Sequence, residues 1–130
     1  MVVIDASVVV PCCWTDAGFA PFAREELLAP PLMWSEARSA LHEGQWRGDL
    51  DPASAEAAHR RLERAPVASR THRRLGQEAW GIADELGWAK TYDAEYLALA
   101  SIVGCRMVTL DARLRRAADR LGFVVSPLEL

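Results

Sequence analysis

The sequence predicts an α/β/α fold, in which helices cover both faces of a mainly parallel sheet. Two observations support this prediction. Short apolar runs alternate with longer stretches of helical periodicity, and the segments between the runs are long enough for helical crossovers. A chain of 130 residues buries about two thirds of its unfolded surface around one core. We therefore expect residues 1–130 to form a single domain.

The first strand is predicted over residues 2–4, a β-branched run that stops at Asp5 as a buried parallel strand stops at its loop. Residues 7–14 and 21–28 are then predicted as helices, with prolines marking the places where turns begin or helices bend. A second short strand is expected over residues 28–29, because the two prolines that follow halt it.

Three helices follow in the middle of the chain. Residues 32–47 carry small and apolar side chains at helical spacing. Pro52 suits the first turn of a helix over residues 52–64. Residues 75–86 show the i, i+4, i+7, i+8, i+11 pattern of an amphipathic helix, and Gly87 supplies its end.

The last part of the chain predicts a buried helix between strands. Residues 94–104 are apolar nearly all round, which indicates a central helix buried on most sides. Residues 106–110 are predicted as a strand that ends at Asp111, residues 112–121 as a basic amphipathic helix, and residues 123–125 as the last strand.

Four acidic residues are expected near one edge of this sheet. Asp5 and Asp111 each follow an apolar strand directly, and ligands of open parallel sheets bind beyond the carboxyl ends of the strands. Asp93 lies at the first turn of the buried helix and can face the same edge. Glu36 lies one turn into the helix after the proline pair, on the border of its apolar face, and can point inward.

Helix capping is the alternative explanation for the three aspartates, because each of them precedes a helix. Four carboxylates in one cleft would repel each other, by roughly 4 kcal/mol for a pair about 4 Å apart at an effective dielectric constant of 20. A divalent cation that prefers oxygen ligands, Mg²⁺ or Mn²⁺, would relieve this repulsion. The hydroxyls of Ser7 and Thr109 are placed to orient the carboxylates or metal-bound water.

Four motifs carry a resemblance to a known family. They are Val3-Ile4-Asp5-Ala6-Ser7, Pro31-x-x-x-x-Glu36, Tyr92-Asp93-Ala94-x-Tyr96-Leu97-Ala98-Leu99-Ala100 and Val108-Thr109-Leu110-Asp111-x-Arg113-Leu114. Together they resemble the PIN-domain family, and most closely the VapC-type ribonuclease toxins of bacterial toxin–antitoxin modules. The motifs run from the first strand to residue 114 and so span nearly the whole chain.

The resemblance implies an α/β/α PIN-like domain with a sheet of about five strands, and a Mg²⁺- or Mn²⁺-dependent endoribonuclease. Asp5, Glu36, Asp93 and Asp111 occupy the positions of the family's catalytic acids, and Asp5 and Asp93 match its most dependable metal-ligand positions. The resemblance further implies an RNA substrate, a homodimer and a cognate antitoxin that lays a helix in an apolar groove.

Other function classes have less support. No glycine-rich phosphate loop is present, and only one acid follows the first strand, which argues against nucleotide-dependent enzymes, phosphotransfer receivers and dehalogenase-like phosphatases. The remaining alternative is a non-catalytic RNA- or protein-binding module of the same fold. No apolar run reaches the roughly 20 residues of a membrane span and no basic leader is present, so we expect a cytoplasmic protein without membrane association.

Arginines, tryptophans and cysteines complete the expectations. Six arginines lie within residues 60–74 against one glutamate, and this basic patch is either a path for RNA or a solvated surface; Arg113 has the better case for RNA contact.

Most of the five tryptophans are expected in the core. The surface around Trp14, Phe19 and Phe22 is assigned to a partner. The three cysteines form no C-x-x-C pair and predict buried free thiols.

Overall fold

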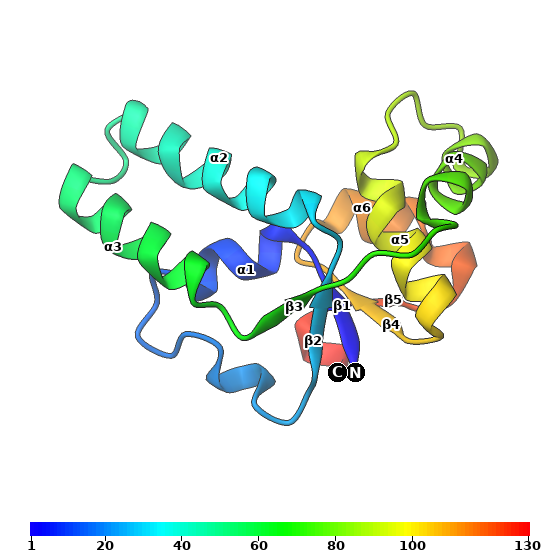
Figure 1. The fold of residues 1–130 in the computed structure, drawn as a ribbon, viewed down its shortest axis with the longest axis horizontal. Coiled ribbons are helices and arrows are strands. Elements are labelled where there is room, and N and C mark those ends of the chain that lie inside the picture. Colours follow the sequence, from blue (N-terminus) through cyan, green and yellow to red (C-terminus); the bar gives the residue numbers. More distant parts are fainter.

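A five-stranded sheet with a group of helices on each side forms the centre of the computed structural model, which describes all 130 residues (Figure 1). The strands are β1 (Val2–Ile4), β2 (Leu27–Ala29), β3 (Val67–Ser69), β4 (Arg106–Val108) and β5 (Val124–Val125). All neighbouring pairs are parallel, in the order β3-β2-β1-β4-β5. The predicted parallel sheet of about five strands is confirmed.

Six helices cover the sheet. They are α1 (Ala6–Cys12), α2 (Leu32–Trp46), α3 (Pro52–Glu63), α4 (Leu75–Leu86), α5 (Tyr92–Val103) and α6 (Ala112–Ala117), with short 3₁₀ turns at η1 (Ala20–Phe22), η2 (Asp119–Leu121) and η3 (Pro127–Glu129). Figure 1 shows α1, α2 and α3 to one side of the sheet and α4, α5 and α6 to the other. This arrangement confirms the three α/β/α layers. None of the helices is long and apolar enough to span a bilayer.

The strand order places a crevice beside β1. The chain passes from β1 outward to β2 and β3, and then returns to place β4 on the opposite side of β1. The helices that follow β1 and β4 therefore leave on opposite faces of the sheet, and in parallel sheets this reversal opens a binding crevice beyond the carboxyl ends of the two strands. Asp5 directly follows β1, and Asp111 follows β4 after two residues.

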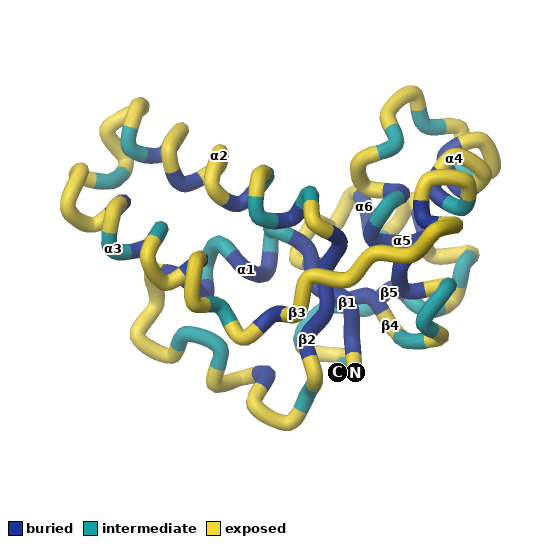
Figure 2. Tube along the Cα trace, viewed as in Figure 1, coloured by how far each residue is buried: buried dark blue, intermediate teal, exposed yellow.

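The core is a single cluster of 32 buried hydrophobic residues. Helix α5 is at its centre, since Ala94 and every residue from Tyr96 to Ala100 are buried and the helix contacts β1, β4 and α4. Figure 2 shows the same distribution, with β1, β2 and the inward faces of the helices buried. The nearly uniform apolar character of this segment therefore has the predicted cause, burial on most sides.

The predicted signals Pro52 and Gly87 stand at the ends of their helices. Asp51 caps α3 by accepting a hydrogen bond from the backbone N–H of Ser54 (2.9 Å), with Pro52 in the first turn. Helix α4 ends at Gly87, which has φ of +72°, a left-handed conformation that glycine adopts without strain.

Two predictions of local structure were wrong. Residues 21–28 do not form a helix: a 3₁₀ turn at Ala20–Phe22 is followed by a turn and then by β2, which pairs with β1 and β3. The strand β3 was missed, because Val67–Ser69 contains one buried residue and two exposed ones and lies at the edge of the sheet. The predicted helix over 112–121 is divided into α6 and η2.

The aromatic side chains differ from expectation more than the backbone does. No tryptophan is among the buried residues, and Trp46 and Trp80 are 86% and 68% exposed. Phe22, which was assigned to a partner surface, is buried in the core, whereas Trp14 is 43% exposed. The cysteines are free as predicted, with Cys12 and Cys13 buried and Cys105 half-buried.

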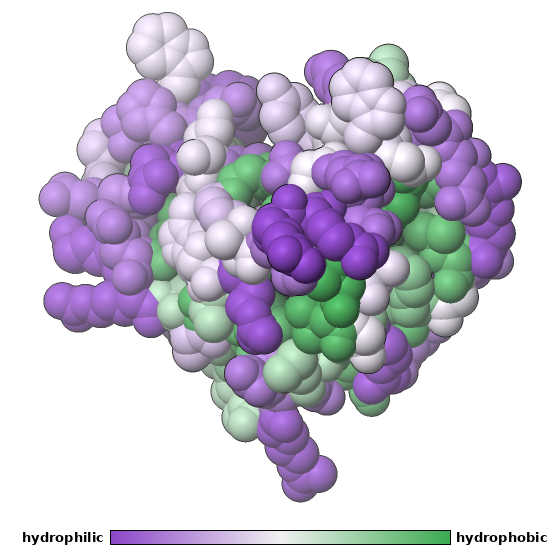
Figure 3. Space-filling model, turned by 45° about the vertical axis from the view of Figure 1, so that its right-hand side comes forward, coloured by the Kyte–Doolittle hydropathy of each residue, from purple (hydrophilic) through white to green (hydrophobic).

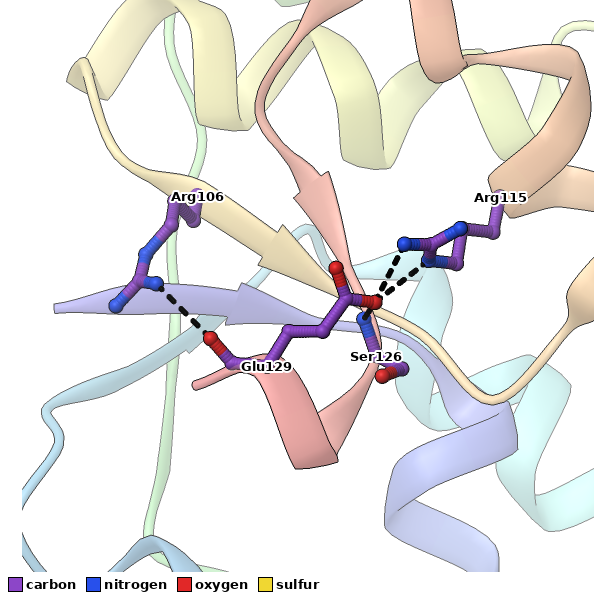
Figure 4. Close-up of polar contacts among 4 residues, drawn as sticks. All are labelled: Arg106, Arg115, Ser126 and Glu129. Carbon is purple, nitrogen blue, oxygen red and sulfur yellow. Dashed lines mark hydrogen bonds and ion pairs between the residues drawn. The ribbon is translucent and has the colours of Figure 1, made fainter.

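The C-terminal turn is attached to the sheet through Glu129 (Figure 4). Its carboxylate accepts hydrogen bonds from Nε of Arg115 (2.8 Å) and from the backbone N–H of Ser126 (3.1 Å), and its backbone carbonyl accepts one from Arg106 at 3.5 Å. The bonds from Ser126, together with Arg115, hold the pKa of Glu129 below its ordinary value. A lowered pKa stabilises the folded state above the ordinary pKa, and this contribution is lost as pH falls through the folded value.

We therefore expect Glu129→Gln to lower the midpoint of thermal unfolding at about pH 7 and to have a smaller effect near pH 3, below the ordinary pKa of the carboxyl. Glu26→Gln makes the same charge change at an exposed position and is the matched control. An equal decrease at both pH values would show that the ionised carboxylate of Glu129 contributes nothing.

Candidate active site

Asp5 is the most deeply buried acidic residue of the chain, with 6% of its surface exposed. It occupies the N-cap position of α1, yet its side chain makes no capping hydrogen bond. Instead, Oγ of Ser7 donates to its Oδ1 and Oγ1 of Thr109 donates to its Oδ2, both at 2.5 Å. Helix capping therefore does not explain this buried carboxylate.

The two hydroxyls tie Asp5 to the loop after β4. Oγ of Ser7 accepts a hydrogen bond from the backbone N–H of Leu110 (2.9 Å), and Oγ1 of Thr109 accepts one from the backbone N–H of Asp111 (3.0 Å). Each hydroxyl thus accepts from the β4 loop and donates to one oxygen of Asp5. This fixes the rotation of the carboxylate and joins the ends of β1 and β4, which confirms the orienting role expected for Ser7 and Thr109.

Burial raises the pKa of Asp5 to about 6. The bonds from Ser7 and Thr109 act in the opposite direction, because they favour the ionised form, and so does the nearby N–H of Val8, which itself bonds the backbone carbonyl of Asp5. The charge of Asp93 raises the pKa further. Desolvation prevails over these hydrogen bonds. The carboxylate is consequently held in a place where its negative charge is unfavourable unless a cation is close.

Asp93 and Asp111 differ in their local roles. Asp93 lies in the first turn of α5 with its side chain free of capping bonds, and its pKa is raised by partial burial and by the charge of Asp111, against the lowering effect of Arg113. Asp111 does cap α6, since its Oδ1 accepts from the backbone N–H groups of Arg113 and Leu114. The capping alternative therefore holds for Asp111 alone.

Glu36 comes to the site from α2, on the other side of the sheet. Its Oε1 accepts a hydrogen bond from the hydroxyl of Tyr96 (2.6 Å), a side chain of α5 that is 1% exposed. Burial raises the pKa of Glu36, and the charges of Asp93 and Glu95 raise it further, against the lowering effect of Tyr96. The same hydrogen bond, together with burial, raises the pKa of the Tyr96 hydroxyl, so that it remains a donor.

Three of the four acids line two hollows that share Asp93, whereas Asp5 lines neither, so the acids do not converge on one point. Glu36 and Asp93 line a hollow of about 530 Å³, and Asp93 and Asp111 line a smaller one of about 260 Å³. Asp93 belongs to both and interacts electrostatically with Asp5, Glu36 and Asp111. No three His, Cys, Asp or Glu side chains anywhere in the structure lie close enough together to hold a metal ion by themselves.

The donor set is nevertheless of the kind that suits a hard divalent cation. The ionisable donors that line the two hollows are carboxylates, and no histidine or cysteine lies among their lining residues. Mg²⁺ commonly binds one or two carboxylates and keeps several water molecules, so three converging acids are not needed. Burial is the main cause of the raised pKa values of Asp5 and Asp93, and the charges of Asp93 on Asp5 and of Asp111 on Asp93 add to it. A divalent ion in the crevice would favour the ionised form of both carboxylates.

Most of the predicted arginine patch lies away from these hollows. Part of it is ordinary surface: Arg60 pairs with Glu56 (3.3 Å), and Arg74 with Glu78 (2.7 Å). The connection over residues 70–74 passes beside a separate hollow of about 370 Å³. That hollow is lined by Met1, Arg70, Thr71, His72, Leu99, Ile102 and Val103.

Figure 3 shows strongly hydrophilic side chains gathered directly beside an apolar patch. Along α5, Val103 lies ten residues beyond Asp93, which is about 15 Å at 1.5 Å per residue. The hollow beside residues 70–74 is therefore at the opposite end of α5 from the acids. Arg113, in contrast, lines both hollows of the crevice, as expected.

Sequence reasoning missed three residues of the site. Tyr96 was read only as part of a buried helix, and its bond to Glu36 joins residues sixty positions apart. Trp88 and Lys90 stand in the short connection between α4 and α5 and line the larger hollow. The only sequence signal for their place in the site is that both lie within five residues before Asp93.

Comparisons with known proteins agree with this arrangement. Residues 2–120 match the PIN domain family. The chain is 33% identical over 115 residues to a protein named VapC ribonuclease Mb0985 from Mycobacterium bovis, covering 88% of each, and 35% identical over 121 residues to Ribonuclease VapC3 from Mycobacterium tuberculosis, covering 89% of this chain and 86% of that protein. The crystal structure of PAE2754 from Pyrobaculum aerophilum has the same fold, with a TM-score of 0.77 and 22% identity over 98% of this chain and 89% of that one. The chain therefore belongs to the PIN domain family, among relatives named VapC ribonucleases.

Proposed function

We propose that this protein is a metal-dependent endoribonuclease toxin of a bacterial toxin–antitoxin system, which hydrolyses RNA phosphodiester bonds with Asp5, Glu36, Asp93 and Asp111. One observation carries the proposal. Asp5 is a buried carboxylate that caps no helix, is oriented through both oxygens, and lies at the strand-order reversal beside Asp93. A purely structural role leaves the cost of burying this charge unexplained.

Asp5 and Asp93 are proposed to hold Mg²⁺, with Mn²⁺ as a substitute. When bound, a divalent ion supplies Lewis-acid activation of the phosphate and of a water molecule. Ser7 and Thr109 keep the Asp5 carboxylate at a fixed rotation, which prepares it to act as a ligand.

Glu36 and Asp111 complete the acidic crevice, Glu36 in the orientation set by the Tyr96 hydroxyl. Either carboxylate can orient the attacking water or accept its proton, because Oε2 of Glu36 and Oδ2 of Asp111 accept no hydrogen bond within the protein. No side-chain nucleophile is required in this scheme.

The remaining proposals follow from the family. RNA is the substrate, a cognate antitoxin protein neutralises the enzyme, and two copies form a homodimer. Residues 1–130 act as one nuclease domain in the cytoplasm. The relatives named VapC ribonucleases support the ribonuclease part of this proposal.

The test is cleavage of total RNA by the purified protein. We expect cleavage with Mg²⁺, none in EDTA, and recovery when Mg²⁺ is restored. An Asp93→Asn variant purified in the same way controls for contaminating nucleases, and Asp84→Asn, an exposed aspartate of α4 outside both hollows, is the matched control that keeps activity. RNA that is bound but never cleaved in the presence of metal would favour the non-catalytic binding module instead.

A further inference from the structure

The connection between α4 and α5 forms a wall of the acidic crevice. The hollow of about 530 Å³ has Glu36 and Asp93 on its acidic side, and its volume is within the range of sites that hold small ligands. The other residues that line it are Gly87, Trp88, Ala89, Lys90, Tyr92 and Arg113. Together with Arg113, which comes from α6, the wall combines two aromatic rings and two cations next to the carboxylates.

The backbone of this wall is held in place. Gly87 ends α4 in a left-handed conformation, and the backbone N–H of Trp88 donates to the carbonyl of Ala83 (2.8 Å), a closing turn typical of glycine-ended helices. The Trp88 side chain packs against the hydrophobic core and is half-buried. The side chains of the wall therefore have a fixed base beside Asp93.

The aromatic rings are available to a ligand. Tyr92 is the first residue of α5, directly before Asp93, and 59% of its surface is exposed. Trp88 lines both the larger and the smaller hollow. An exposed ring at the edge of a nuclease crevice is placed to stack on a base, and stacking tolerates any base because each has a π-face.

The two cations supply what the carboxylates lack. Lys90 is the only lysine of the chain, and neither it nor Arg113 forms an ion pair. Both line the larger hollow. The acids of the crevice repel phosphate, so positive charge at its rim is needed to attract an RNA backbone.

We infer that this wall binds the nucleotide next to the cleaved bond of single-stranded RNA. Tyr92 stacks on the base, Trp88 supports it from the core side, and Lys90 and Arg113 contact the adjoining phosphates. The substrate is single-stranded because bases within a duplex are already stacked and cannot reach the ring. This inference rests on the proposed function, which it extends by naming the residues that hold the substrate.

The experiment measures RNA binding without cleavage, in an Asp5→Asn background with Mg²⁺ present. The probe is an end-labelled RNA of about 12 nucleotides of mixed sequence, a length within the range of single-strand sites. A second probe has the same sugars and phosphates but no bases. Fluorescence anisotropy gives the affinity for both.

Loss of the ring in Tyr92→Ala is expected to weaken binding of the normal RNA about 5- to 50-fold and of the base-free RNA less than about 2-fold. Tyr92→Phe keeps the ring and is expected to bind like its parent. Lys90→Gln is expected to weaken both probes equally and to reduce the salt dependence, because it removes a phosphate contact. Trp80→Ala removes an exposed ring elsewhere on α4 and is the matched control.

Unchanged affinity in Tyr92→Ala, or an equal loss for both probes, overturns the inference and leaves the exposed ring to a protein partner. Tyr92 lies on the surface at the first residue of α5, so its replacement does not open the core, and circular dichroism verifies the fold. If the wild-type protein cleaves RNA with Mg²⁺ while the Tyr92 variants bind normally, this inference alone fails. If the wild type neither binds nor cleaves RNA, the proposed function fails with it.

Discussion

Replacing Asp5 with asparagine is expected to abolish RNA cleavage and, at the same time, to stabilise the metal-free protein. Asparagine has the shape of aspartate but no charge, so it cannot hold a divalent cation between itself and Asp93. Loss of one member of a catalytic unit commonly costs a factor of roughly 10³ or more in rate. The measurement is the initial rate of RNA cleavage with Mg²⁺ in wild type, Asp5→Asn and the exposed control Asp84→Asn.

The gain in stability follows from the burial of the charge. The pKa of Asp5 is raised from 3.8 to about 6, and each pKa unit corresponds to about 1.4 kcal/mol, so keeping the carboxylate ionised above pH 7 costs about 3 kcal/mol. Asparagine removes this cost. The asparagine amide has one acceptor oxygen and one NH2 donor, so one of the two hydroxyls loses its acceptor, which costs about 1 kcal/mol. We expect a net gain of about 2 kcal/mol in urea unfolding at about pH 8 in EDTA.

The two outcomes together separate function from structure. Replacing a carboxylate that serves the fold would make the protein less stable, whereas replacing one that serves catalysis makes the protein inactive but more stable. A destabilised Asp5→Asn protein with normal cleavage would therefore contradict the whole assignment. Asp93 is more exposed, so Asp93→Asn is expected to lose activity with a smaller change in stability.

Patterns with strong periodicity predicted the elements that position the site. The apolar face of α4, the nearly uniform apolar surface of α5 and the run at β1 each have one physical explanation, burial, and the structure has all three. The crevice follows from these elements, because parallel strands joined by helices bring Asp5 and Asp111 to one edge of the sheet.

The failures occur where tertiary contacts prevail over local preference. Residues 21–28 contain alanine, arginine, glutamate and leucine, which favour helix, but β2 forms there because its backbone pairs with β1 and β3. Strand β3 has little apolar pattern and exists through its pairing with Leu27–Ala29. No local signal in either segment reports a partner that is distant in the sequence.

The same limit applies inside the site. Residue type and strand-end position indicated the four acids, but not their different local roles. Asp111 caps α6 while Asp5 caps nothing, a distinction set by side-chain rotation. The bond between Tyr96 and Glu36 joins two helices that cover opposite faces of the sheet, so it is a property of the packed structure.

The metal-free protein is expected to lose stability as pH rises from about 4 to about 7. A group whose pKa is raised in the folded state contributes stability below its ordinary pKa and loses it as pH rises through the folded value, which for Asp5 means from 3.8 through about 6. Glu36 and Asp93 also have raised pKa values and act in the same direction. The lowered pKa values of Asp51 and Glu129 act in the opposite direction, and their effect lies at and below the ordinary carboxyl pKa, at the acidic end of this window.

Mg²⁺ is expected to reverse this loss. An ion that binds the ionised carboxylates of the folded protein, and not the unfolded chain, adds about 2.7 kcal/mol at a hundred times its dissociation constant. The gain should be large near pH 7.5 and small near pH 5, where Asp5 is protonated. Urea unfolding across this range, with Mg²⁺ or with NaCl at equal ionic strength, separates binding from screening. In Asp5→Asn, most of the dependence of stability on pH and most of the stabilisation by Mg²⁺ should be lost. A wild-type stability that changes neither with pH nor with Mg²⁺ would mean that the crevice carries no charge surplus for an ion to neutralise.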